Sequence, residues 1–368
     1  MTAAPVAGPR VWAGEPLELH GPVSLPDFLL EHARDLGDKP ALVDGPTGRT
    51  LSYRQLADGV ERVAAGLAAR GFGPGDVLAI SSPNLPEYAL ALYGAMAAGG
   101  AVTGANPLLT AGELAGQLAD AGASALVTVP PFLDVARAAA EKAGVGEVLV
   151  FGEAEGATPF ASLLTAGDTS PHVRIHPSRD LAALPYSSGT TGLPKGVEPT
   201  HANLVANARQ SQAAVGFTPD DVVVGVAPFF HAMGQNLILP CSLRAGATVV
   251  SMPSFDLAGF LGLIQDHRAT CTIVPAPTRR PASSRSPTWP CGPRPRPRSS
   301  RPGWPSGSRP SSGSATSASS TRSRGRPRAS CCAAPWSRRS GPAPDRPRRC
   351  ASPGAGPPRR AGRRRRGC

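Results

Sequence analysis

Residues 278–368 lack most of the side chains from which folded proteins build a core. This segment contains no Val, Ile, Leu, Met, Phe or Tyr, and no Lys, Glu, Gln, Asn or His. A segment with so little apolar surface cannot offset the conformational entropy that ordering would cost. We therefore expect residues 278–368 to be a disordered, low-complexity basic tail.

Acidic residues are also nearly missing from this tail. The arginines of the tail are therefore not balanced, and they make the whole chain basic. Residues 278–368 hold 23 Arg and one acid, Asp345, whereas residues 1–277 hold 15 Lys and Arg against 25 Asp and Glu. The formal net charge of +12 therefore comes from the tail. A basic balance often indicates a nucleic-acid or membrane partner. Residues 1–277 give no such indication, and we expect no specific nucleic-acid partner.

The chain also lacks a zinc-site spacing, a signal sequence and a membrane-spanning run. Its seven cysteines include no Cys-x-x-Cys pair, which argues against a zinc site and against a disulfide framework. The N-terminal residues contain no apolar signal-peptide core, and no apolar run reaches the roughly 18 residues that a membrane span needs. We therefore expect a cytoplasmic protein without a membrane span or a bound structural metal.

Between residues 51 and 276, helical and strand-like patterns alternate. Apolar residues recur at three- and four-residue steps in 56–71, which predicts a helix ending at Gly71. Thr110 and Glu113 have the spacing of a capping box that opens another helix. Further helices are predicted at 85–100 and 256–269, and β-branched runs predict strands at 76–81, 125–129, 147–151, 221–228, 248–253 and 270–275. This alternation predicts an α/β fold with parallel sheets covered by helices.

The stretch 184–204, LPYSSGTTGLPKGVEPTHANL, has the composition of a phosphate-binding loop. Hydroxyl groups, glycines and one cation gather there: Ser187, Ser188, Gly189, Thr190, Thr191, Gly192 and Lys195. These are the donors that a polyphosphate needs. The spacing differs from a Walker A loop, where Gly-Lys precedes Ser or Thr. A flexible linker is the alternative, and the strand-like run before the loop and the helical pattern after it disfavour that alternative.

The sequence YSSGTTGLPKGV followed by THANL resembles the signature loop of the AMP-forming acyl-adenylating enzymes. That superfamily includes acid–CoA ligases, peptide-synthetase adenylation domains and luciferases. The stretches 75–114, 222–234 and 246–270 most resemble the branch of 4-coumarate–CoA ligases and acyl-CoA synthetases. The resemblance implies an N-terminal extension, 1–23, and then a partial AMP-dependent synthetase/ligase domain, 24–277. It also implies the layered parallel-sheet architecture of the first part of that family's large domain.

The resemblance implies a reaction in two steps that uses ATP, Mg²⁺ and CoA. A small-molecule carboxylic acid attacks the α-phosphate to give an acyl-adenylate and pyrophosphate, and the CoA thiol then displaces AMP. The loop residues become ATP-phosphate contacts, with Lys195 as a catalytic cation. His231, the second catalytic candidate, lies by resemblance between the acyl pocket and the adenylate. Taken alone, His231 is better explained as a packed core histidine.

Two departures from the family pattern leave the acid open. Met233 stands where hydroxycinnamate ligases usually carry Tyr, and Ser254 stands where they often carry a basic residue expected to help hold CoA. An aromatic, hydroxycinnamate-like acid and a fatty or other apolar acid are therefore both credible. The remaining polar candidates receive structural roles: His201 caps or packs at a helix start, and Asp220 and Asp221 form a solvated turn.

Three interpretations of the tail compete: a disordered segment that binds nucleic acid or another polyanion, a linker between partners, and the out-of-frame translation of a GC-rich gene. We favour the third, because Arg, Pro, Gly and Ala dominate the tail and the change falls beside a buried strand pattern. The resemblance implies further downstream parts, including a YGxTE motif and a second catalytic Lys, which this sequence lacks. We therefore expect a truncated, catalytically inactive chain with an exposed apolar sheet surface and poor solubility.

Overall fold

Two five-stranded sheets organise the part of the chain that the computed structural model describes, residues 23–165, 173–187 and 194–274. In spatial order, the first sheet contains β12 (Cys271–Thr272), β10 (Val222–Gly225), β11 (Thr248–Ser251), β1 (Pro40–Asp44) and β2 (Thr50–Ser52). The second contains β4 (Ala101–Ala105), β3 (Val77–Ser81), β5 (Ala123–Thr128), β6 (Glu147–Val150) and β7 (Thr158–Pro159). A further hairpin pairs β8 (Tyr186–Ser187) with β9 (Lys195–Gly196).

Parallel pairing prevails in both five-stranded sheets, as the sequence predicted. Within these sheets only β1 and β2 are antiparallel, and every other neighbouring pair is parallel. All residues of β3, β4 and β11 are buried. Strands buried on both faces explain the continuous apolar runs in the sequence.

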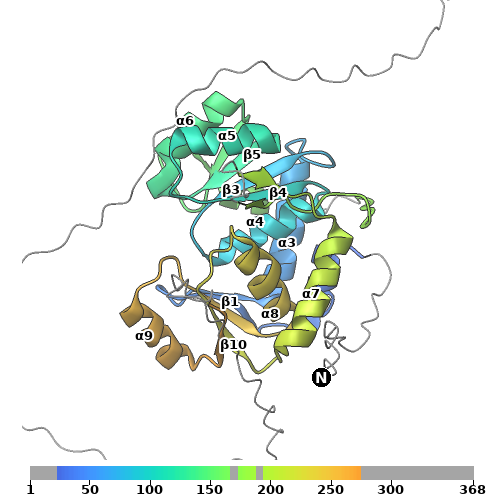
Figure 1. Ribbon diagram of the computed structural model, residues 1–368, viewed down its shortest axis with the longest axis vertical. Helices are drawn as coiled ribbons and strands as arrows, with labels where there is room; N and C mark the ends of the chain where they lie inside the picture. The colour runs from blue at the N-terminus through green and yellow to red at the C-terminus, as the bar shows by residue number, and fades with distance from the viewer. Residues whose placement is uncertain (1–22, 166–172, 188–193, 275–368) are drawn as a thin grey trace, which may run out of the picture. The chain divides into compact units, whose positions relative to one another are not determined.

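In the described part of the chain, two helices precede the first strand, and the other helices lie in connections between strands. The helices are α1 (Leu25–Leu30), α2 (Ala33–Leu36), α3 (Tyr53–Ala68), α4 (Pro86–Ala97), α5 (Ala111–Ala121), α6 (Leu133–Ala143), α7 (His201–Val215), α8 (Leu239–Ala245) and α9 (Leu257–His267). Two 3-10 turns, η1 (Pro130–Phe132) and η2 (Phe160–Thr165), and one π-helical turn, η3 (Gly234–Ile238), complete the described elements. Figure 1 shows α3 and α4 between the two sheets, with α5 and α6 on the far side of the second sheet and α9 beside the first.

The largest core cluster lies around α4, where the two sheets face each other. Tyr88 and Tyr93 of α4 are fully buried, and burial raises the pKa of both phenols. Glycines bring α3 and α4 together: a Cβ built at Gly94 would lie 2.4 Å from Cγ1 of Val63. Only glycine fits that position while the helices stay this close.

The start of α3 shows a capping box that our sequence analysis missed. The helix begins at Tyr53, three residues earlier than predicted, because Ser52 Oγ accepts from the Gln55 amide while Gln55 Oε1 accepts from the Ser52 amide. The predicted end is confirmed: the regular helix closes at Ala68, and Gly71, with φ of 85°, is the C-terminal glycine of a Schellman motif. The Gly71 amide donates to Ala68 O at 2.9 Å and the Phe72 amide donates to Leu67 O at 3.0 Å.

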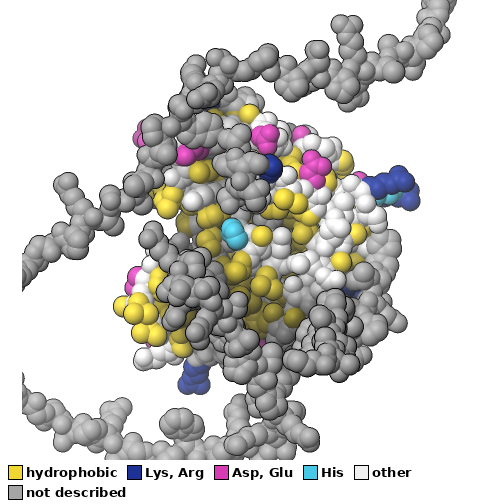
Figure 2. Space-filling view, viewed as in Figure 1, with side chains coloured by type: hydrophobic (Ala, Val, Ile, Leu, Met, Phe, Trp, Pro, Cys, Tyr) yellow, Lys and Arg dark blue, Asp and Glu magenta, His cyan; other side chains and the backbone are white. Residues whose placement is uncertain are grey.

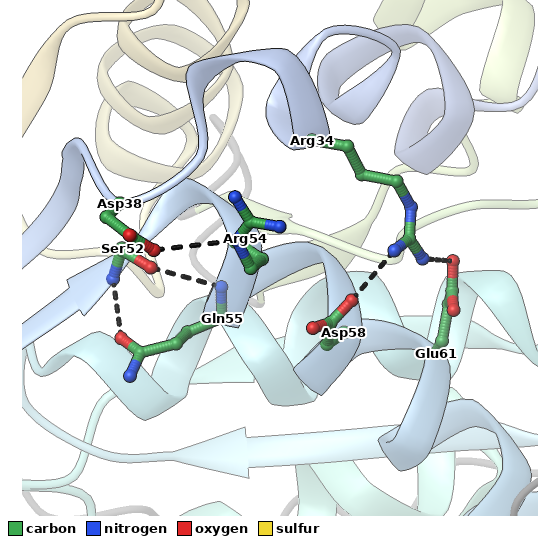
Figure 3. A network of polar contacts seen from close by, with 7 residues as sticks. All are labelled: Arg34, Asp38, Ser52, Arg54, Gln55, Asp58 and Glu61. Carbon is green, nitrogen blue, oxygen red and sulfur yellow. Dashed lines mark hydrogen bonds and ion pairs between the residues drawn. The ribbon is translucent and has the colours of Figure 1, made fainter.

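Surface ion pairs surround this capping box (Figure 3). Arg34 of α2 bridges Asp58 at 3.0 Å and Glu61 at 2.7 Å, both on α3. These side chains are largely exposed, so the pairs orient α2 on α3 but contribute little to stability. The network is structural and lies outside the candidate functional residues.

Asp221 is more than the solvated turn that the sequence suggested. Its carboxylate accepts from the Thr218 amide at 2.8 Å and from Thr270 Oγ1 at 2.7 Å. Partial burial acts to raise the pKa of Asp221, but these hydrogen bonds outweigh it and lower the pKa. The carboxylate thereby ties the start of β10 to the approach of β12.

Within the described ranges, no helix combines the length and apolar character that a membrane crossing requires.

Candidate functional site

The hairpin of β8 and β9 brings two of the predicted phosphate contacts together. Ser187 and Lys195 are direct partners across the antiparallel pair, next to the Tyr186–Gly196 pair. Both Ser187 and Lys195 are exposed. The other predicted contacts, Ser188, Gly189, Thr190, Thr191 and Gly192, lie outside the described residues, so their role stays a prediction.

The chain before this hairpin lies along β4, the edge strand of the second sheet. The Val102 amide donates to Ala182 O at 3.1 Å, and the Leu184 amide donates to Val102 O at 2.8 Å. Thr103 adds a buried hydrogen bond from Oγ1 to Leu184 O at 2.8 Å. The hairpin therefore starts from a rigid, buried strand edge, which suits a site that must hold its geometry.

Helix α5 supports the same base from the other side. Gln117 Nε2 donates to Thr103 Oγ1 at 3.1 Å and to Gly104 O at 3.0 Å. Tyr186 Oη of β8 donates to Asp120 Oδ2 at 2.5 Å. Burial and then this hydrogen bond raise the pKa of Tyr186, so the phenol stays protonated and remains a donor near neutral pH. Sequence reasoning singled out none of Thr103, Gln117, Asp120 and Tyr186.

Helix α7 begins a few residues after the hairpin, at His201. Thr200 is its N-cap and forms a capping box with Asn203. His201 packs at the helix start, as predicted, and is fully buried: its Nδ1 accepts from the Leu25 amide at 3.1 Å. Burial lowers the pKa of His201 to about 4, so the ring is neutral at physiological pH. A neutral, packed ring beside the fold's first helix has a structural role.

His231 lies in the turn between β10 and η3. Its side chain is exposed, so the alternative of a packed core histidine is wrong. His231 Nδ1 accepts from the Met233 amide at 3.3 Å, and Met233 is half-buried against the core. With Nδ1 accepting, Nε2 is the ring nitrogen left to donate.

A buried asparagine that the sequence analysis did not single out shapes this turn. Asn84 is 2% exposed, and its Nδ2 donates to Gly225 O and Ala227 O, both at 3.0 Å. Its Oδ1 accepts from the Phe229 amide at 2.7 Å. One side chain thereby fixes three backbone groups just before His231.

The carboxyl end of β4 contacts both the segment that leads into the β8–β9 hairpin and the turn that carries His231. Thr103 binds the base of the hairpin, and at its neighbour Gly104 a Cβ would lie 2.8 Å from the backbone of Phe230. The hairpin and the turn that carries His231 therefore meet consecutive residues of one strand. Ligands of open parallel sheets bind at such carboxyl ends.

No group of three His, Cys, Asp or Glu side chains in the described ranges could hold a metal ion. The donor set at the hairpin is instead a hydroxyl and an ammonium group, which fits phosphate oxygens.

Comparisons with known proteins show which family the chain belongs to. A family model described as AMP-binding enzyme matches residues 29–284. The 4-coumarate–CoA ligases 3 and 5 of Oryza sativa subsp. japonica are 37% and 41% identical over 258 and 257 residues. These alignments cover 69% and 68% of this chain, but 46% and 47% of the relatives. The chain thus spans about half the length of the curated relatives it matches.

The fold is similar to solved structures of the same kind. A long-chain-fatty-acid–CoA ligase from Archaeoglobus fulgidus superposes with a TM-score of 0.66 at 26% identity, over 71% of this chain and 53% of that one. The predicted layered α/β architecture is thereby confirmed for the described residues.

Proposed function

Because the chain belongs to the AMP-binding enzyme family, we propose that its β8–β9 hairpin contacts the phosphates of ATP in an acid–CoA ligation reaction. The observation that carries the proposal is the direct pairing of Ser187 with Lys195, both exposed, on a hairpin anchored to β4. A hydroxyl donor beside an ammonium group complements phosphate oxygens. The five neighbouring residues between 188 and 192 belong to the same proposed contact.

In the proposed reaction, a carboxylic acid displaces pyrophosphate from ATP, and CoA then displaces AMP from the acyl-adenylate. Lys195 stabilises the negative charge that develops as pyrophosphate leaves. Mg²⁺ enters with the nucleotide. His231, exposed beside the carboxyl end of β4, provides an N–H group toward the reacting carboxylate.

The acid is proposed to be aromatic or fatty, with the choice set beside His231. Two relatives carry the name 4-coumarate–CoA ligase, and one similar structure is named as a ligase of long-chain fatty acids. Met233, flexible and apolar, contacts the core next to His231 and accommodates either acid.

Complete turnover by this chain alone is proposed to be absent. The chain spans about half of its relatives' length, and Lys195 is its last lysine.

Residues 278–368, which we interpret as an out-of-frame translation, lie outside the described residues. Sequencing codons 270–290 and translating all frames tests that interpretation: a frame that restores an apolar α/β pattern with a YGxTE-like motif supports it. If no frame does so, the alternative of a genuine polyanion-binding tail gains support. The cytoplasmic location expected from the sequence stays part of the proposal.

The decisive experiment is titration of the purified chain with Mg-ATP and with pyrophosphate. We expect Lys195→Ala to weaken ATP binding by about tenfold, the effect of losing one charge-assisted contact worth ~1.5 kcal/mol. Lys142→Ala, at the end of α6, is the matched control and should bind as the parent does. A parent chain that binds no ATP, or a Lys195→Ala variant with parental affinity, contradicts the proposal.

Acid-dependent ATP–pyrophosphate exchange tests the proposal that this chain does not catalyse the reaction. We expect no exchange above background from the purified chain. Detectable exchange that depends on an added acid would show that the chain is active.

A further inference from the structure

Helix α5 makes one direct polar contact with the β8–β9 hairpin, through Asp120, and one indirect contact, through Gln117 and Thr103 of β4. Gln117 and Asp120 are three residues apart, so they share one face of the helix. Gln117 holds Thr103, which in turn holds Leu184, and Asp120 accepts from Tyr186. Both contacts therefore end on residues just before Ser187.

The Tyr186 ring also covers the returning strand of the hairpin. A Cβ at Gly196 would lie 3.3 Å from the ring, so the ring packs on the β9 backbone beside Lys195. Strands β8 and β9 pair over only two residues each. Just beyond this pairing, the Val197 amide donates to Pro185 O at 2.9 Å. Tyr186 is therefore placed to control how closely β8 and β9 approach.

The position of Asp120 is unfavourable for the helix itself. Asp120 lies in the last turn of α5, before the C-cap Gly122, where the helix dipole disfavours a carboxylate. The side chain is exposed, so no core packing explains the acid. A residue that breaks a local rule in this way often serves a site elsewhere in the fold.

We propose that the Tyr186–Asp120 hydrogen bond, supported by Gln117, positions Ser187 and Lys195 for binding the phosphates of ATP. We call this hydrogen bond the α5 tether. Tyr186 and Asp120 are positioning residues, since they act through Ser187 and Lys195. The inference rests on the proposed function for its ligand, but the tether itself can be measured without any ligand.

The chain's lysines make that measurement direct. There are three, Lys39, Lys142 and Lys195. The bond after Lys39 precedes Pro40 and resists lysine-specific proteases, so cleavage after Lys142 and Lys195 remains. Lys195 reports on the hairpin, and Lys142, at the end of α6, reports on the rest of the fold.

The test is lysine-specific proteolysis of the full chain, combined with Mg-ATP titration. In Tyr186→Phe and in Asp120→Ala we expect cleavage after Lys195 to accelerate about fivefold, as the loss of one net hydrogen bond predicts. Cleavage after Lys142 should not change. The Mg-ATP dissociation constant should rise by a similar factor. The double variant should show no further effect, because both substitutions remove one interaction.

Tyr53→Phe is the matched control. Its hydroxyl donates to Ala247 O at 2.6 Å in the core, so its loss lowers overall stability without affecting the hairpin. We expect cleavage after Lys195 to stay at the parental rate in this variant.

The possible outcomes separate this inference from the proposed function. Parental cleavage and parental affinity in Tyr186→Phe, or additive effects in the double variant, overturn the tether. A parent chain that does not bind Mg-ATP overturns the proposed function, and it also overturns the binding role of the tether. Faster cleavage after Lys195 in that case still confirms that the hydrogen bond orders Ser187 and Lys195.

Discussion

His201 shows how a single buried side chain makes the stability of this fold depend on pH. The ring is fully buried at the start of α7, and its Nδ1 accepts the Leu25 amide. Burial, only partly opposed by Asp180 and Asp27, lowers its pKa to about 4, from 6.5 in an unfolded chain. Between these values the unfolded state binds more protons than the folded state.

We therefore predict that stability falls as the pH is lowered from 6.5 to 4. The lowered pKa corresponds to ~3 kcal/mol of unfolding free energy. This contribution is fully present above pH 6.5 and is lost as the pH falls toward 4. His201→Asn keeps an acceptor near the Leu25 amide but cannot be protonated, so its unfolding free energy should vary less between pH 7 and pH 5. Urea unfolding at the two pH values measures this difference. His176→Asn, at an exposed site, is the control, and an unchanged slope in His201→Asn would contradict the assignment.

At the scale of elements, two helical glycines have opposite surroundings. A Cβ at Gly66 of α3 would lie 2.3 Å from Leu163 O, in the backbone of η2. A Cβ at Gly116 of α5 would meet nothing within 4 Å. Gly66 therefore allows η2 to pack closely on α3, whereas Gly116 only lowers helix propensity.

We predict opposite effects for the two alanine variants. Gly116→Ala should raise the unfolding free energy by about 0.5–1 kcal/mol, because alanine favours the helix. Gly66→Ala should lower it by about 1–3 kcal/mol, because backbone atoms must shift. Parallel denaturant titrations provide the measurement. A Gly66→Ala variant as stable as the parent, or more stable, would show that α3 and η2 do not pack as described.

At the scale of the whole described structure, α9 is the least covered helix. None of its residues is buried: Leu257 and Leu261 are 64% and 55% exposed, and Phe255, just before the helix, is 61% exposed. Hydrophobic side chains are visible at its position in Figure 2. The expected exposed apolar surface is therefore present, but it lies on a helix rather than on a sheet face. Such a cluster promotes association.

We predict that replacing Leu257 and Leu261 together by Lys raises the concentration at which the chain aggregates. Because both side chains are largely exposed, the melting temperature should change little. Leu108→Lys is the matched control: Leu108 is 78% exposed, but it lies on the connection between β4 and α5. Light scattering against concentration measures the effect. Equal aggregation of the double variant and the parent would exclude α9 as the cause.

Local patterns predicted most of the helices and strands, whereas the roles of the candidate site residues stay predictions. The capping box at Thr110 and Glu113 is confirmed, as are the buried runs of β3, β5 and β11. The composition of 187–195 indicated phosphate chemistry, and the structure pairs Ser187 with Lys195. The capping box at Ser52 was equally local and was missed. Caps and periodicity are readable because they depend on residues within one or two helical turns.

Only the tertiary structure decided what supports the site. Tyr186 meets Asp120 across 66 residues of sequence, and Asn84 holds the Phe229 amide across 145. The exposure of His231 likewise depends on how the turn after β10 lies against β4. No local pattern marks such partners, because their approach results from the packing of α5, β4 and β10 into one fold.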